Sequence, residues 1–190
     1  YWDAYLDVNR KFARAVKRNA EEGDFLWIHD YHLIPLAGLL NSAGFRGDCS
    51  FFLHIPFPPP DIFAKLPWRT EFLHALLHYR FVGFQTSRDR RNFTDCLRVF
   101  FPEARIEGRG PIVRVRASGM EAWAGNLPIS VDAGEFIRLS RSLEVTVKAR
   151  SIRENLGRKR LLFSVDRLDY TKGIPEKLRA FRYLLENHPA

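Results

Sequence analysis

The sequence predicts an α/β fold with a mostly parallel β-sheet. Short apolar runs alternate with segments of helical spacing along most of the 190 residues. Several of the apolar runs end in clusters of charged or histidine residues, the place where α/β proteins put ligand groups. The chain contains no internal repeat and no low-complexity segment. These observations favour alternating β–α units over a bundle or an all-β fold.

Apolar runs bounded by turn residues predict the strands. They lie at Phe25–Ile28, Ser50–Ile55, Phe81–Phe84, Ile112–Arg116, Leu127–Val131 and Arg160–Val165. Helical spacing and capping residues predict the helices. These cover residues 3–20, Leu33–Leu40, Ile62–Leu66, Trp68–Tyr79, a helix from Thr86 to Phe100, one capped by Asp132, Glu144–Leu156 and Pro175–Asn187. The run Pro56–Pro60 predicts a rigid loop.

The order of elements predicts a domain followed by the start of a second one. Residues 1–142 are predicted to form part of a Rossmann-like domain, 143–159 a connector helix, and 160–190 the first βα unit of an incomplete second domain. One strand and one helix are too little to bury a core alone. Tyr1–Arg18 is predicted to be an amphipathic helix within the fold rather than a leader, and because no Met opens the sequence we expect a part of a longer protein.

The formal net charge of +8 leaves open a nucleic-acid surface, a solvated basic surface or a cleft for phosphorylated ligands. Cations are spread along the whole chain and no nucleic-acid-binding signature is present, so we expect no nucleic-acid partner. No apolar run approaches the ~20 residues of a membrane span, so no membrane partner is expected. Cys49 and Cys96 lack metal or disulfide spacing and are interpreted as buried thiols of a cytoplasmic protein.

The segment FLWIHDYH, Phe25–His32, crowds polar groups at the end of an apolar strand. Asp30 has two interpretations here: it accepts hydrogen bonds from a sugar hydroxyl, or it merely caps the following helix. Composition alone favours the cap. His29 and His32 with Asp30 also raise a metal site, but no second ligand cluster has convincing spacing, and we expect no metal.

The segment FFLHIPFP, Phe51–Pro58, places His54 at the end of another buried strand. A lone histidine there is more often satisfied by backbone groups than catalytic. The prolines behind it weigh the other way, because they fix the loop and so the direction of His54. This rigidity suits a residue that contacts a ligand.

The segment LLFSVDRLDYTKG, Leu161–Gly173, is the most informative part of the chain. Arg167 and Lys172 follow a strand and precede a helix started by Pro175. Cations in this position hold phosphorylated ligands: arginine offers a planar fork of donors and lysine a compact charge. The alternative is a surface ion-pair network, but each exposed pair contributes only ~0–1 kcal/mol. The sequence therefore predicts a phosphate or diphosphate site.

Four strings together resemble the trehalose-6-phosphate synthase family of retaining GT-B glycosyltransferases. They are WIHDYHL (Trp27–Leu33), FFLHIPFP (Phe51–Pro58), GFQT (Gly83–Thr86) and VDRLDYTKG (Val165–Gly173). The resemblance implies two Rossmann-like domains with the active site in the cleft between them. It also implies transfer of glucose from UDP-glucose to glucose 6-phosphate, giving α,α-trehalose 6-phosphate and UDP.

Matched position by position, the resemblance implies that Asp30 contacts glucose 6-phosphate and that His54 touches the donor sugar. Ile55 would shape the sugar pocket, and Arg167 and Lys172 would hold the UDP diphosphate. The family is thought to react on one face of the sugar, with the diphosphate helping to deprotonate the acceptor, so no cofactor or metal is expected. A homo-oligomer is left open.

Part of the family's pattern is not in this chain. The family's amino-terminal glycine loop and acceptor contacts, which come before Tyr1, are missing. So are the phosphate-binding arginine and the ribose contacts of the later second domain, and Pro128–Asp132 reads PISVD where PIGID is usual. We therefore expect the chain alone to be inactive. Two alternatives remain: transfer to another phosphorylated acceptor such as glycerol 3-phosphate, and a catalytically silent regulatory homologue. Donor nucleotide, oligomeric state and regulation do not follow from the sequence.

Overall fold

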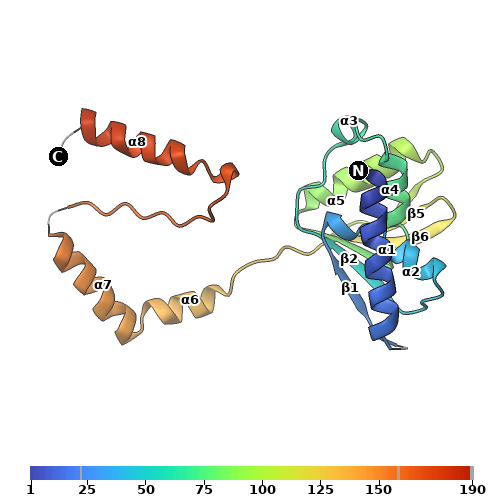
Figure 1. The fold of residues 1–190 in the computed structure, drawn as a ribbon, viewed down its shortest axis with the longest axis horizontal. Helices are drawn as coiled ribbons and strands as arrows, with labels where there is room; N and C mark the ends of the chain where they lie inside the picture. Colours follow the sequence, from blue (N-terminus) through green and yellow to red (C-terminus); the bar gives the residue numbers. More distant parts are fainter. Residues whose placement is uncertain (22, 158, 189–190) are drawn as a thin grey trace. The chain divides into compact units, whose positions relative to one another are not determined.

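The computed structural model describes residues 1–21, 23–157 and 159–188. It divides into two compact units, Tyr1–Ser130 and Val131–Ala190. The first unit carries the β-sheet, and the second carries α6, α7, α8 and the short turn η2 (Figure 1). The predicted boundaries at 142, 159 and 160 stay a prediction. The two units are described separately below.

The sheet of the first unit is mixed, with its parallel part at one end. Its strands are β1 (Leu26–His29), β2 (Cys49–Leu53), β3 (Phe81–Phe84), β4 (Arg105–Glu107), β5 (Ile112–Ala117) and β6 (Met120–Asn126). Their order is β1-β2-β3-β6-β5-β4. β1, β2, β3 and β6 pair in parallel, whereas β5 pairs antiparallel with both β6 and β4. The prediction of a mostly parallel sheet is confirmed for the part that carries the sequence motifs.

Helices connect the parallel strands, as the alternating pattern predicts. In the first unit they are α1 (Trp2–Asn19), η1 (Tyr31–Leu33), α2 (Leu36–Ser42), α3 (Pro60–Phe63), α4 (Arg69–Leu76) and α5 (Ser87–Phe100). In the second unit they are α6 (Ala133–Ser140), α7 (Leu143–Leu156), η2 (Tyr170–Lys172) and α8 (Ile174–Asn187). The predicted caps form: Thr86 Oγ1 accepts from the backbone N–H of Asp89, and Asp132 accepts from that of Glu135. No helix in the described residues is long and apolar enough to cross a membrane.

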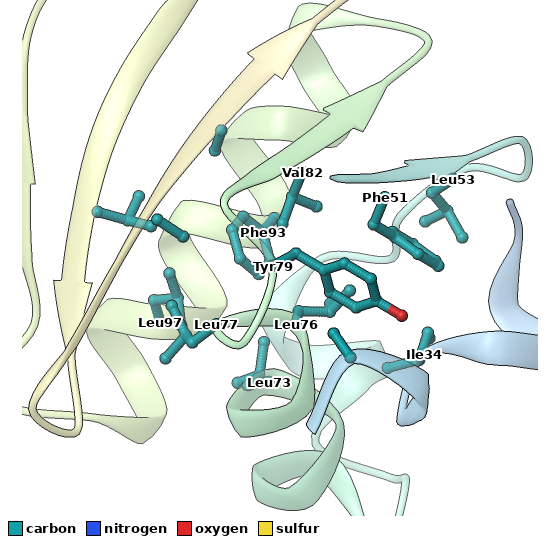
Figure 2. Close-up of a cluster of buried hydrophobic side chains, with 14 of the residues drawn as sticks. Ile34, Phe51, Leu53, Leu73, Leu76, Leu77, Tyr79, Val82, Phe93 and Leu97 are labelled. Carbon is teal, nitrogen blue, oxygen red and sulfur yellow. The ribbon is translucent and has the colours of Figure 1, made fainter. Parts of the chain in front are cut away.

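One face of the sheet forms the hydrophobic core with the helices (Figure 2). Phe51 and Leu53 of β2 alternate with residues of the other face and pack with side chains from α2, α4 and α5. Tyr79 is fully buried beside them, and its hydroxyl donates to the carbonyl of Leu33 at 2.7 Å. Burial raises the pKa of Tyr79 well above its usual value, so the phenol stays neutral and keeps this bond.

The other face of the parallel strands carries a layer of aromatic rings. Trp27 and His29 of β1 lie on it, and so does Phe52 of β2. The ring of Phe52 lies over Gly83 of β3, where a Cβ atom would come within 2.7 Å of Phe52 Cδ2. Gly83 is therefore required by close packing, and its absent side chain lets Phe52 be buried on this face.

Two predicted strands are wrong. Leu127–Val131 lies beyond β6, which ends at Asn126. The physical reason is Pro128, which has no N–H for a ladder, while the N–H of Ile129 is taken by a side chain. Arg160–Val165 makes no ladder among the described residues of the second unit. A strand needs a neighbouring strand for its backbone groups, and the described part of Val131–Ala190 has helices and turns instead.

The two cysteines are free and buried, as the sequence indicates. Burial, together with nearby acidic groups, raises the pKa of Cys49 to about 11 and that of Cys96 to about 12. A thiol is nucleophilic only as thiolate, so neither group is activated for catalysis.

We predict that Gly83→Ala lowers the free energy of unfolding by ~1–3 kcal/mol, because the new methyl group would overlap the ring of Phe52. Urea denaturation measures this. The matched control is the same change in a Phe52→Leu background, where the smaller side chain should remove much of the penalty. Equal penalties in both backgrounds would rule out the contact as the cause.

A second prediction concerns the half-buried imidazole of His78, whose ring lies 5.1 Å from that of His74. Burial, then the charge of His74, lowers the pKa of His78. The unfolded chain therefore binds a proton at a higher pH than the folded chain does. The free energy of unfolding should fall as pH drops from the ordinary histidine value of ~6.5 towards the lower folded pKa. Replacing His78 by Gln should flatten this slope in denaturation curves measured across that range; an unchanged slope would contradict it.

Candidate active site

The parallel register brings the predicted residues of the first unit to the carboxyl ends of neighbouring strands. His29 of β1 lies beside Phe52 of β2, and Phe52 lies beside Gly83 of β3. Asp30 and His54 follow β1 and β2 directly, so both lie at the carboxyl ends of neighbouring strands. The backbone N–H of Asp30 donates to the carbonyl of Phe52 at 2.8 Å and ties the two strand ends together.

Asp30 has an unusual backbone conformation. Its dihedral angles are φ 70° and ψ 163°, a region populated almost only by glycine. Its Oδ1 accepts the N–H of Tyr31 at 3.0 Å, so the predicted capping role is real. A cap does not require this backbone, however, because capping residues normally have extended backbones with negative φ. Strain of this kind costs ~1–3 kcal/mol and clusters at functional sites.

The ring of His54 is held by two other rings. Its Nε2 lies 2.9 Å from Nδ1 of His29, within hydrogen-bond distance. The edge of Phe52 meets it at 4.9 Å between centroids. His29 is in turn packed by Trp27 at 4.5 Å. The imidazole that the sequence places at the site is therefore fixed, while both histidines stay exposed to solvent.

His29 lies beside His54 at the candidate site, a neighbour that the sequence does not reveal. The sequence raises His29 only as a metal ligand, because the spacing of one chain segment does not show which residue of the next strand lies beside it. The parallel pairing of β1 and β2 supplies that information. Among the described residues no group of three or more His, Cys, Asp or Glu side chains is arranged to hold a metal ion. That no metal takes part stays a prediction.

The loop after His54 is anchored to the core through Phe57. Phe57 is buried and packs on Phe84 and Phe93 at 5.8 and 5.5 Å. Its carbonyl accepts from Asn92 Nδ2 at 2.7 Å. Ile55, next to His54, remains 44% exposed and lines an apolar cavity of about 300 Å³. The position suits the predicted role of Ile55 in a pocket wall.

The third strand end contributes a link that the sequence did not reveal. Gln85 follows β3 in the GFQT string, and its Oε1 accepts the backbone N–H of Ile129 at 3.0 Å. This bond fixes the segment that leaves β6, where PISVD replaces the usual family string. Gln85 thus holds the segment that follows β6 at the end of the first unit.

The predicted cations lie in the second unit, around η2. Arg167 has a side chain 82% exposed, and its nearest carboxylate, that of Asp169, is 3.9 Å away. Lys172 makes no ion pair or hydrogen bond through its ammonium within the described residues. The alternative of a surface ion-pair network, with Arg167 paired to Asp169 and Lys172 facing solvent, agrees with these contacts, although the one pair is long and exposed; Asp166 pairs with Lys177.

Local hydrogen bonds hold the acidic residues of this turn as anions. Asp169 accepts from both the backbone N–H and the hydroxyl of Thr171, at 2.9 and 2.8 Å. These bonds, helped by the charges of Arg167 and Lys172, lower the pKa of Asp169. Gly173 ends η2 with φ 59°, the left-handed conformation that glycine adopts without strain. Asp169 and Gly173 shape the turn, so the side chains of Arg167 and Lys172 are not needed to hold it.

The structure brings Asp30, His54 and Ile55 together at the carboxyl ends of β1 and β2. It places Arg167 and Lys172 around η2 in the other unit. Imidazole, carboxylate and apolar groups suit a sugar, and paired cations suit phosphate oxygens.

Comparison with known proteins agrees with this chemistry. The chain is 41% identical over its whole length to "Alpha,alpha-trehalose-phosphate synthase [UDP-forming] 1" of Aphelenchoides avenae, of which it spans 17%. A crystal structure of an α,α-trehalose-phosphate synthase (UDP-forming) from Burkholderia xenovorans in complex with glucose-6-phosphate is 35% identical, with a TM-score of 0.81. An E. coli structure described as trehalose-6-phosphate bound with UDP-2-fluoro glucose is 37% identical, with a TM-score of 0.80.

These two structures are matched by 98% and 99% of this chain, which spans 41% of each of them. The predicted α/β fold is thereby confirmed. The model of glycosyltransferase family 20 matches residues 1–190. The chain therefore belongs to glycosyltransferase family 20.

Proposed function

We propose that the protein to which this chain contributes transfers glucose from UDP-glucose to glucose 6-phosphate with retention, releasing UDP and α,α-trehalose 6-phosphate. The observation that carries the proposal is the pair of exposed cations around η2, Arg167 just before it and Lys172 at its end. Arg167 and Lys172 are exposed and make at most one weak ion pair within the described chain. A weak, exposed ion pair contributes little to stability, whereas two exposed cations suit a diphosphate.

The reaction follows from charge. The bond between the sugar C1 and the diphosphate oxygen breaks, and the electron pair leaves with UDP. The oxygen of the acceptor's anomeric hydroxyl bonds to C1 on the same face, and its proton passes to the departing phosphate oxygen. Negative charge develops on the diphosphate in the transition state, where fixed cations stabilise it most. Arg167 and Lys172 would supply that stabilisation, and the scheme needs no metal ion.

The strand edge of the first unit would bind the sugars. The carboxylate of Asp30 would accept from a hydroxyl of glucose 6-phosphate, since its Oδ2 makes no hydrogen bond to a described residue. His54, with a fixed ring, would contact the donor sugar, and Ile55 would form part of the pocket wall. We place the reaction in the cytoplasm, in keeping with two free, buried thiols. The chain on its own is expected to be inactive, and a homo-oligomer is left open.

We predict that Arg167→Ala and Lys172→Ala, each in the complete natural protein, lower the rate of UDP release by about 100-fold, the equivalent of ~3 kcal/mol. UDP release from UDP-glucose is measured with and without glucose 6-phosphate, and again with a metal chelator present. The matched controls are Arg179→Ala and Lys177→Ala, which remove the same charges from the following helix, where they pair with Glu176 and Asp166.

Release that needs glucose 6-phosphate, withstands the chelator and collapses only in the two turn variants supports the proposal. Release that requires glycerol 3-phosphate instead of glucose 6-phosphate would support the diphosphate site but would contradict the proposed acceptor. A folded protein that is silent with every acceptor would be a regulatory homologue.

Asp30 offers a test that separates its capping role from its role in binding. Asp30→Asn keeps an oxygen for the N–H of Tyr31, so stability should change little, while acceptor-dependent UDP release should fall about 10- to 100-fold. Asp30→Gly should raise the free energy of unfolding by ~1 kcal/mol, because glycine adopts φ 70° without strain, and should lower activity as well. Urea denaturation and the UDP assay measure both. Full activity in the two variants would leave Asp30 as a cap only.

A further inference from the structure

The contact between His29 and His54 has a chemical consequence beyond holding two rings together. Nδ1 of His29 and Nε2 of His54 are 2.9 Å apart, and a hydrogen bond at that distance needs one donor and one acceptor. A neutral imidazole has one of each. One of the two facing nitrogens must therefore carry a proton and the other must not.

This pairing couples the tautomer of His54 to that of His29, and so links His29 to the group that His54 presents on its free side. If His29 Nδ1–H donates, His54 Nε2 is bare and its Nδ1 must carry the proton, so His54 offers a donor. If His54 Nε2–H donates, its Nδ1 is bare and offers an acceptor. The choice of tautomer by a partner on the far nitrogen is a general property of histidine. Without His29 the two tautomers of His54 would interconvert freely, and its ring would keep only the contact with Phe52.

The contacts around the pair favour a fixed arrangement. Trp27 packs on the His29 ring, and Phe52 packs on both His29 and His54. Phe52 is itself seated over Gly83. The chain of contacts from Gly83 to Trp27 crosses three strands whose parallel register fixes it. His29 is exposed and lies outside the hydrophobic core cluster, on the opposite face of the sheet. Core packing therefore does not account for a histidine at this position.

We propose that His29 is a positioning residue that fixes the ring orientation and tautomer of His54, and thereby the hydrogen bond that His54 makes with the donor sugar. The proposal rests on the function proposed above for its last step. The control of the His54 tautomer by His29 concerns the protein without ligand, and it can be tested without measuring enzyme activity.

The kinetic test uses His29→Leu, His29→Asn and the control His32→Leu in the complete natural protein. Leucine removes the hydrogen bond, and kcat/KM for UDP-glucose should fall about tenfold, which corresponds to ~1.4 kcal/mol. KM for glucose 6-phosphate should stay unchanged. The asparagine amide places a polar atom near the position of Nδ1 and should restore most of the loss. His32 lies in the same turn, and its ring stacks on Tyr31 rather than on His54; its change should leave both constants unaltered.

The spectroscopic test reads the tautomer directly from long-range ¹H–¹⁵N spectra of the imidazoles. One tautomer of His54 should dominate in the unaltered protein and in His32→Leu, and the two should mix in His29→Leu. The same dominant tautomer in His29→Leu would overturn the proposal, whatever the kinetics. A fall in activity that asparagine does not reverse, or one shared equally by donor and acceptor constants, would also overturn it. A protein with no transferase activity but with the tautomer controlled by His29 would refute the proposed function and keep the positioning role.

Discussion

The parallel register of β1, β2 and β3 is the constraint on which the candidate site depends. It sets His29 beside Phe52 and Phe52 beside Gly83, so that Asp30 and His54 come off adjacent strand ends. A shift by one residue would send every side chain to the opposite face of the sheet. The imidazole of His29 would then face the core, and Phe51 and Leu53 would leave it. Burial of the core residues on one face of the sheet therefore fixes the positions of Asp30 and His54 at the strand ends.

The same constraint explains why the site tolerates local strain. Asp30 holds a backbone conformation that costs ~1–3 kcal/mol, and it does so between a hydrogen bond to Phe52 on β2 and the first turn of η1. Both neighbours are anchored, because β2 is buried along its whole length and Tyr79 donates to Leu33 at the end of η1. A loosely held loop would relax to a negative φ and turn the carboxylate away. The packed core thus provides the rigidity that orients a single acidic group.

Much of the first unit could be predicted from sequence because its signals are local. Apolar runs, the cap at Thr86 and the proline loop each act within a few residues. Features that depend on a partner elsewhere in the chain were missed or misplaced. β6 was placed too late because its alternating segment, Met120–Asn126, gains its identity from pairing with β3 and β5. Leu161–Val165 carries the composition of a strand, but the described residues of its unit give it no neighbour to pair with. The role of His29 was hidden for the same reason, since only the β1–β2 pairing reveals its partner.

The two sets of predicted site residues, one in each unit, differ in how they are held, and the difference fits what each is proposed to bind. Sugar hydroxyls are neutral, so their recognition requires donors and acceptors held in a fixed direction. The packed ring of His54 and the strained backbone of Asp30 would supply these under the proposed function. A diphosphate is charged, and the attraction of a cation acts over a longer range than a hydrogen bond. Arg167 and Lys172 are exposed on their turn, where solvent screens their charges until a ligand displaces the water. To stabilise a leaving group they would have to be ordered around it, because fixed charges stabilise a transition state most. Under the proposed function, the first unit would supply directed hydrogen bonds to sugar hydroxyls, and the second would supply cations for the charged leaving group.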